Sequence, residues 1–279
     1  MAKRTPEGPP PPPAVQKLRL RYTKRGRLRF TSHRDIARAF ERALRRAQVP
    51  MAYSAGFSPH PKISWVGAAP TGVASEAEYV EISLAVRVDP ARLQAALDDS
   101  LPDGIDVVEV VEAVPGTSLP DRVQASEWEV RLPQVGLGHA QRAVDAFLAA
   151  PEVLVQRLVK DGMRTLDARA ATVRIAASST DGDPSCATLS LVVRHVTPAV
   201  RPDDVLSGLR LVADLEMPVP PAATRVRQGP LTETGEVGDP LAPDRDAAPA
   251  AAQAGETRQA ADPDEVAAGT EALEVAAHP

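Results

Sequence analysis

The sequence has 279 residues, a formal net charge of −5 and an aromatic content of only 3%. Its single cysteine, Cys186, excludes an internal disulfide and a metal site built from cysteines. No apolar run approaches the roughly 20 residues that cross a bilayer, and the first residues lack the hydrophobic stretch of a signal peptide. We therefore expect a cytoplasmic protein without membrane contact.

The first half of the chain predicts one α+β domain over residues 17–114. Residues 1–16 are rich in proline and are expected to be disordered. Residues 17–22 alternate apolar and basic, which predicts a half-buried strand with Arg19 and Arg21 on its outer side. Ser32 and Asp35 resemble a capping box that begins a helix, and Pro50 ends it. The apolar stripe of this helix comprises Ile36, Phe40, Leu44 and Ala47.

Strands are predicted next over residues 62–66 and 78–88. A helix opens at Pro90 and carries leucines at helical spacing, and a last strand covers residues 105–111. The resulting order, βαββαβ, is typical of a ferredoxin-like domain.

A linker over residues 115–126 separates this domain from a second half over residues 127–231, where a new sheet is expected. Its predicted strands cover residues 127–132, 153–160, 172–177, 187–194 and 223–228, and its helices cover 140–149 and 202–209. The second half thus has one strand more than the four strands of the βαββαβ order. The sequence therefore predicts an α+β protein with two tandem ferredoxin-like domains, the second with an added hairpin.

Residues 232–279 form an acidic segment dominated by Ala, Pro, Gly, Asp and Glu, with eleven acidic residues against two arginines. This composition predicts a disordered tail. The tail either solubilises the protein or mimics nucleic acid by folding back over a basic face.

The positive charge of the chain is concentrated near its start. Residues 17–62 contain thirteen Lys or Arg and two acidic residues, which gives this segment +11 and leaves −16 for the rest. A basic surface on an acidic molecule is the usual footprint of a polyanion-binding protein. RNA is the leading candidate ligand.

Two features of the basic segment supply candidate binding residues. An arginine stripe lies opposite the apolar side of the predicted helix and either binds phosphates or is simply solvated. The loop YSAGFSPHPKISW combines aromatic rings and cations with rigid Pro and Gly, a combination that suits stacking of unpaired bases. The candidate substrate-binding residues are Arg25, Arg27, Arg34, Arg38, Arg42, Arg45, Tyr53, Phe57, His60 and Lys62.

Other interpretations of the same residues stay open. Tyr53 and Trp65 could fill the core while the prolines only shape a turn. His33 and His60 could form an acid–base pair for metal-independent RNA cleavage, although no nucleophile is evident beside them. The acidic residues of GVASEAEYVEI are expected to pair with arginines, and we expect neither a metal site nor a cofactor.

The strings KRGRLRFTSHRDIARAFERALRRAQVPMAYSAGFSPHPKISW and PTGVASEAEYVEISL resemble the radical SAM-linked protein family, a domain of unknown function encoded beside radical SAM proteins or fused behind them. The resemblance covers roughly residues 17–231. Where that family commonly has SHLD, this chain has Arg34 in place of the leucine, which enlarges the basic face. The resemblance implies a separately encoded radical SAM partner, because Cys186 alone cannot supply the thiolates of such an enzyme's cluster.

These observations favour a noncatalytic partner protein that binds RNA or another phosphate-rich substrate. By analogy of fold alone, tandem ferredoxin-like domains also occur in CRISPR repeat-processing endoribonucleases. The alternatives are an endoribonuclease that uses His33 and His60, or a docking subunit whose arginines meet an acidic protein.

Overall fold

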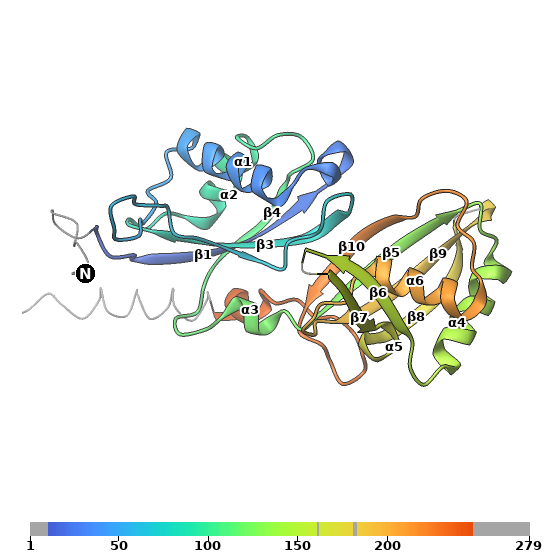
Figure 1. Ribbon diagram of the computed structural model, residues 1–279. Helices are drawn as coiled ribbons and strands as arrows, with labels where there is room; N and C mark the ends of the chain where they lie inside the picture. Colours follow the sequence, from blue (N-terminus) through green and yellow to red (C-terminus); the bar gives the residue numbers. More distant parts are fainter. Residues whose placement is uncertain (1–10, 161, 181–182, 248–279) are drawn as a thin grey trace, which may run out of the picture.

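The computed structural model describes residues 11–160, 162–180 and 183–247 of an α+β protein (Figure 1). The first half contains β1 (Gln16–Lys24), the 3-10 helix η1 (Gly26–Phe30), α1 (His33–Arg46), β2 (Ile63–Val66), β3 (Ala74–Leu84), α2 (Pro90–Asp98) and β4 (Val107–Glu112). The second half contains α3 (Leu119–Arg122), β5 (Ala125–Pro133), α4 (Leu137–Ala149), β6 (Leu154–Val159), β7 (Gly162–Asp167), α5 (Ala168–Ala171), β8 (Thr172–Thr180), β9 (Asp183–Arg194), α6 (Pro202–Ala213) and β10 (Ala222–Gly229). No helix of this described part combines the length and the apolar character needed to cross a membrane.

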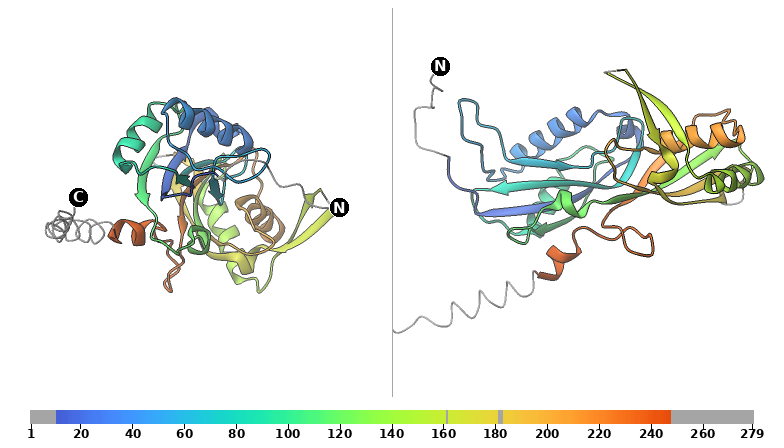
Figure 2. Two further views of the ribbon diagram at one scale, coloured as in Figure 1. Left: turned by 90° about the vertical axis from the view of Figure 1, so that its left-hand side faces the viewer. Right: turned by 60° about the horizontal axis from the view of Figure 1, so that its bottom comes forward.

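One mixed sheet runs through both halves, in the order β4-β1-β3-β10-β5-β9-β8, with β2 also paired to β3. Neighbouring strands within each half are antiparallel, whereas β10 joins β3 in parallel through Thr224 opposite Ala74 and Arg225 opposite Ser75. The β6–β7 hairpin is separate from this sheet and extends away from it (Figure 2). The expectation that the second half starts a new sheet is therefore wrong, because the last strand returns to the first half.

Helices α1 and α2 cover one face of the first half of the sheet (Figure 1). Helix α1 begins after Ser32, whose hydroxyl oxygen accepts a hydrogen bond from the Asp35 amide, as a capping residue should. The predicted apolar stripe is confirmed, since Ile36, Phe40 and Leu44 are buried in the core of this half. Burial of that stripe fixes the opposite side of the helix toward solvent.

Helices α4 and α6 form the core of the second half together with β5, β8 and β9. Phe147 of α4 is fully buried and lies against Gly208 of α6. A Cβ atom added at Gly208 would lie 2.9 Å from the Phe147 ring, so the glycine permits close packing of the two helices.

The other face of the first half is covered by α3 and by the chain after β10 (Figure 1). Leu119 of α3 and Leu241 are fully buried in a cluster with Tyr79 and Val111. Residues 115–126 therefore contain a packed helix rather than only a linker. Residues 232–247 likewise belong to the folded structure, which corrects the expected start of the disordered tail; the expectations for residues 1–10 and 248–279 fall outside the described residues.

Arg19 shows why the strand pattern of β1 was misleading. Alternation placed this residue on the outer side of the strand, yet its side chain is fully buried. Its guanidinium donates to Glu81 at 3.0 Å, to Asp244 at 2.8 Å and to the carbonyl oxygen of Thr117 at 2.7 Å. The buried charge is stable in this position because the two carboxylates neutralise it and all three partners accept hydrogen bonds from it.

Candidate nucleic-acid interface

The outer side of α1 presents a row of exposed arginines: Arg34, Arg38, Arg42 and Arg45. Within residues 11–160, 162–180 and 183–247, no carboxylate lies within ion-pair distance of Arg34 or Arg42. Arg38 makes one long contact of 3.5 Å with Asp35, and both side chains are more than half exposed. Such a contact contributes little, so the row carries charge that an incoming anion can use.

The remaining predicted cations differ from one another in their surroundings. Arg25 already binds two carboxylates, those of Glu76 and Asp106. Arg27 and Lys62 are exposed, and no such partner is found for them among the described side chains. Arg25 is therefore committed to the fold, whereas the charges of Arg27 and Lys62 are open to solvent.

Residues 51–62 form a narrow hairpin-like loop that follows α1. Tyr53 and Pro61 lie opposite each other as an isolated bridge. The Ser54 amide donates to the His60 carbonyl oxygen at 2.9 Å, and the His60 amide donates to the Ser54 hydroxyl oxygen at 3.1 Å. These bonds close the base of the loop.

Phe57 stands at the tip of this loop with 70% of its surface exposed. Gly56 beside it has a φ of 140°, a conformation that residues with a side chain rarely adopt. Tyr53 is 42% exposed, whereas Trp65 packs against the core of the first half. The suggestion that Tyr53 and Trp65 fill the core therefore fits Trp65 and does not fit Tyr53.

The two candidate histidines are placed in different surroundings. The His33 ring packs edge-on against Trp65, with ring centroids 5.2 Å apart, and Trp65 in turn contacts Tyr22 and Phe40. His60 lies in the loop and hydrogen-bonds through its backbone. Across the described residues no hydrogen bond joins either imidazole to the other or to a carboxylate, so nothing in this geometry assembles an acid–base pair.

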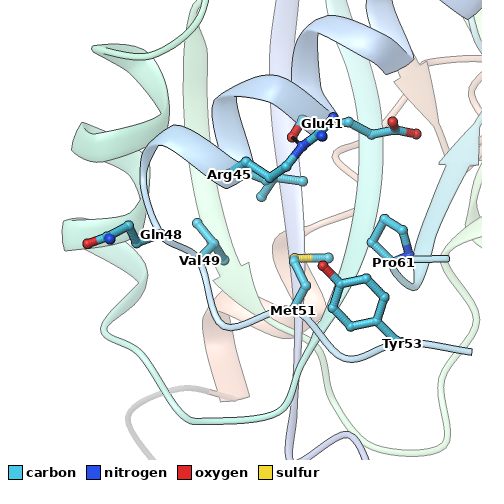
Figure 3. Close-up of a pocket in the computed structure, with 8 residues that line it drawn as sticks. Glu41, Arg45, Gln48, Val49, Met51, Tyr53 and Pro61 are labelled. Atoms are coloured by element: carbon cyan, nitrogen blue, oxygen red, sulfur yellow. Dashed lines mark hydrogen bonds between the residues drawn. The ribbon is translucent and has the colours of Figure 1, made fainter. Parts of the chain in front are cut away.

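A pocket of about 400 Å³ lies between the end of α1 and the loop (Figure 3). Its lining residues are Glu41, Leu44, Arg45, Gln48, Val49, Met51, Tyr53 and Pro61. The Arg45 Nε donates to the backbone oxygen of Glu41 at 3.1 Å, which folds the guanidinium back along the helix. The pocket therefore brings one arginine of the row, Arg45, and one aromatic residue of the loop, Tyr53, to the same site.

Glu41 is the charged lining residue that sequence reasoning did not single out. Its signal was available, because Glu41 and Asp35 are the only acidic residues between positions 17 and 62. Among the described contacts its carboxylate has no hydrogen bond or ion pair.

The acidic residues of the segment GVASEAEYVEI form ion pairs, as expected. Glu76 binds Arg25, and Glu81 binds both Lys17 and Arg19 at 3.0 Å. Their partners lie on β1 and the turn after it, so these carboxylates leave the arginines of α1 uncovered.

A buried charged cluster lies where β3 meets β10. Glu78 and Arg225 form an ion pair with both side chains almost fully buried, and the Arg225 guanidinium lies 5.4 Å from the centre of the Trp128 ring. Lys24 is 2% exposed and donates to the Pro70 carbonyl oxygen at 3.2 Å; burial lowers the pKa of its ammonium group. Because Glu78 lies on β3 and Arg225 on β10, the cluster links the two halves. Its charged groups are buried, so they are not presented to a ligand.

Comparison with known proteins gives a family but no described relative. No curated protein matches the chain. A crystal structure of a Cbf5-Nop10-Gar1 complex matches with 12% identity and a TM-score of 0.42, over 79% of this chain and 51% of that one, so the chain spans about half of its length. The cryo-EM structure of the encapsulated DyP-type peroxidase from Mycobacterium smegmatis matches with 11% identity and a TM-score of 0.19, over 79% of this chain and 94% of that one. Neither likeness is close enough to support a fold or a function.

The comparison with protein families gives a clearer result than these structural matches. The family described as "Uncharacterized protein conserved in bacteria (DUF2344)" matches residues 17–202, about two thirds of the chain. The matched region includes all of β1 except Gln16, together with α1, the loop at residues 51–62 and the pocket between α1 and this loop. The protein therefore belongs to the DUF2344 family of uncharacterised bacterial proteins.

Proposed function

We propose that this protein is a noncatalytic RNA-binding partner protein and that the face formed by α1 and the loop at residues 51–62 is its binding surface. One observation carries the proposal: Arg45, from the exposed arginine row of α1, and the partly exposed ring of Tyr53, from the loop that carries the exposed Phe57, line the same pocket. Arginines bind the phosphates of a nucleic acid, and exposed rings stack on unpaired bases. We also propose that each half is a ferredoxin-like unit. Once the β6–β7 hairpin and the one-turn helix α5 are set aside, each half has the βαββαβ order and antiparallel strands in the order 4-1-3-2.

Titration of the full-length protein with labelled single-stranded RNA over a range of salt concentrations tests the proposal. Each phosphate contact to a single strand contributes about 0.7 to the slope of log K against log salt. About five contacts would therefore give a slope near −3.5. Absence of RNA binding at low salt would refute the proposal, and tight binding of an acidic protein in place of RNA would favour the docking alternative.

The loop tip separates a binding protein from an enzyme. We expect Phe57→Ala to weaken RNA binding by about 1–3 kcal/mol, the usual contribution of one stacked base. Thermal stability should not change, because the ring is 70% exposed. Fluorescence anisotropy and a thermal melt measure the two effects.

His60→Ala serves as the control for this experiment. Its imidazole makes no hydrogen bond in the described structure, so the substitution should change affinity far less than Phe57→Ala. We expect no RNA scission by the wild-type protein. Metal-independent cleavage that disappears in His33→Ala or His60→Ala would instead establish the endoribonuclease.

We further propose that the RNA is handed to a separately encoded radical SAM enzyme, on the strength of the sequence resemblance. This chain lacks the cysteines for such a cluster, and Cys186 is buried. Isolation of the tagged protein from its native cells should recover an iron–sulfur protein together with RNA. Recovery of RNA alone, in repeated isolations under anaerobic conditions, would count against the partnership and leave RNA binding intact.

A further inference from the structure

The pocket between α1 and the loop contains one residue that a simple phosphate-binding surface does not explain. Glu41 is partly exposed on α1, and its carboxylate has no partner among the described residues. A carboxylate in a row of arginines repels the phosphates that the row attracts. Its presence becomes favourable for binding when the bound group donates hydrogen bonds to it.

The rest of the pocket suits a flat, largely neutral group. Leu44, Val49 and Met51 supply an apolar surface, and Tyr53 and Pro61 stand at the side formed by the loop (Figure 3). A volume of about 400 Å³ is in the range of small-molecule sites and accommodates a nucleobase. A base that enters this pocket could stack on the Tyr53 ring while the arginines of α1 remain at its phosphates.

The Watson–Crick edges of the four bases differ in what they offer a carboxylate. Guanine presents two adjacent donors, its N1–H and its N2 amino group. Adenine and cytosine place an acceptor beside their donor, and uracil places an acceptor on each side of its single donor. A carboxylate accepts hydrogen bonds only. Guanine is therefore the one base whose Watson–Crick edge donates to both carboxylate oxygens, whereas each of the other three edges would place an acceptor lone pair against one of them.

We propose that this pocket binds an unpaired guanine of the RNA and that Glu41 reads its Watson–Crick edge. This inference rests on the proposed RNA-binding function and adds base specificity to it. Tyr53 stacks on the base, and Arg42 and Arg45 hold the neighbouring phosphates.

Short labelled oligouridines with one central substitution test the assignment by fluorescence anisotropy at low salt. We expect the oligonucleotide with a central guanine to bind about tenfold more tightly than the one with a central adenine, as a good bidentate contact allows. Inosine, which lacks the N2 amino group, should bind with an affinity between the two. Glu41→Gln should bring the guanine and adenine affinities to within about twofold, because an amide pairs one acceptor with one donor.

Asp35→Asn is the matched control, since it removes the other acidic charge of α1 at a position outside the pocket. This variant should bind both oligonucleotides more tightly and keep the preference for guanine. Binding without base preference, or a preference that survives Glu41→Gln, would overturn the guanine assignment and leave RNA binding standing. Failure of every oligonucleotide to bind would overturn both.

Discussion

Reversing two charges on α1, Arg38→Glu together with Arg42→Glu, should abolish RNA binding and leave the fold unchanged. Both side chains point to solvent, and the only contact of either with a carboxylate among the described residues is the long one between Arg38 and Asp35. Exposed substitutions of this kind usually change stability by less than about 0.5 kcal/mol. Anisotropy titrations measure the affinity, and a thermal melt measures the stability.

The salt dependence of binding and a matched control test whether the loss of affinity comes from the arginines on α1. In the milder double variant Arg38→Gln with Arg42→Gln, which should keep weakened binding, loss of two phosphate contacts should make the slope of log K against log salt shallower by about 1.4. The matched control reverses Arg142 on α4 and Arg210 on α6, two exposed arginines of the second half. The control changes the net charge equally but should retain most of the affinity. Equal losses in the two variants would mean that net charge, rather than the face on α1, determines binding.

Local sequence patterns were sufficient to predict the elements that form this face. Ser32 and the spacing of Ile36, Phe40 and Leu44 predict where α1 begins and which side is buried, and the structure agrees. The exposed loop tip follows from Gly56 and the flanking prolines for the same reason, since both are local constraints on the backbone. Such features depend on residues a few positions apart.

The parts that sequence reasoning missed depend on distant residues. The parallel contact between β3 and β10 joins residues about 150 positions apart through only two paired positions, and no local pattern announces it. Arg19 was placed outside because alternation cannot show that residues 241–244 cover that side of the sheet. The partner that buries it, Asp244, lies 225 positions away in a segment whose composition is typical of disorder.

We expect Asp244→Ala to lower the free energy of unfolding by about 3 kcal/mol, near the lower end of the range for breaking a buried ion pair. The Asp244 carboxylate is 1% exposed and accepts hydrogen bonds from Arg19, from Arg122 and from the Val114 amide at 2.7–2.9 Å. Arg19 would lose this partner but keep Glu81, which moderates the loss. Urea denaturation measures the change.

Two controls identify the origin of that loss. Asp246→Ala removes an exposed acid two residues away and should leave stability unchanged. Truncation after residue 231 removes Leu241 and Asp244 together and should destabilise at least as much as Asp244→Ala, whereas truncation after residue 247 should not. Unchanged stability after the longer truncation would show that residues 232–247 do not contribute to the fold.

The pH dependence of this pair distinguishes the charge of Asp244 from its packing. Burial alone would raise the pKa of the Asp244 carboxyl, but hydrogen bonds from Arg19, the Val114 amide and Arg122 outweigh burial and hold the pKa below its usual value. A group with a lowered pKa stabilises the folded state above its unfolded pKa, about 3.9 for aspartate, and loses that contribution as the pH falls through the folded value. The stability difference between wild type and Asp244→Asn should therefore be constant near neutral pH and shrink below about pH 4. A difference that stays the same down to about pH 2 would assign the effect to shape and hydrogen bonding rather than to the ionised carboxylate.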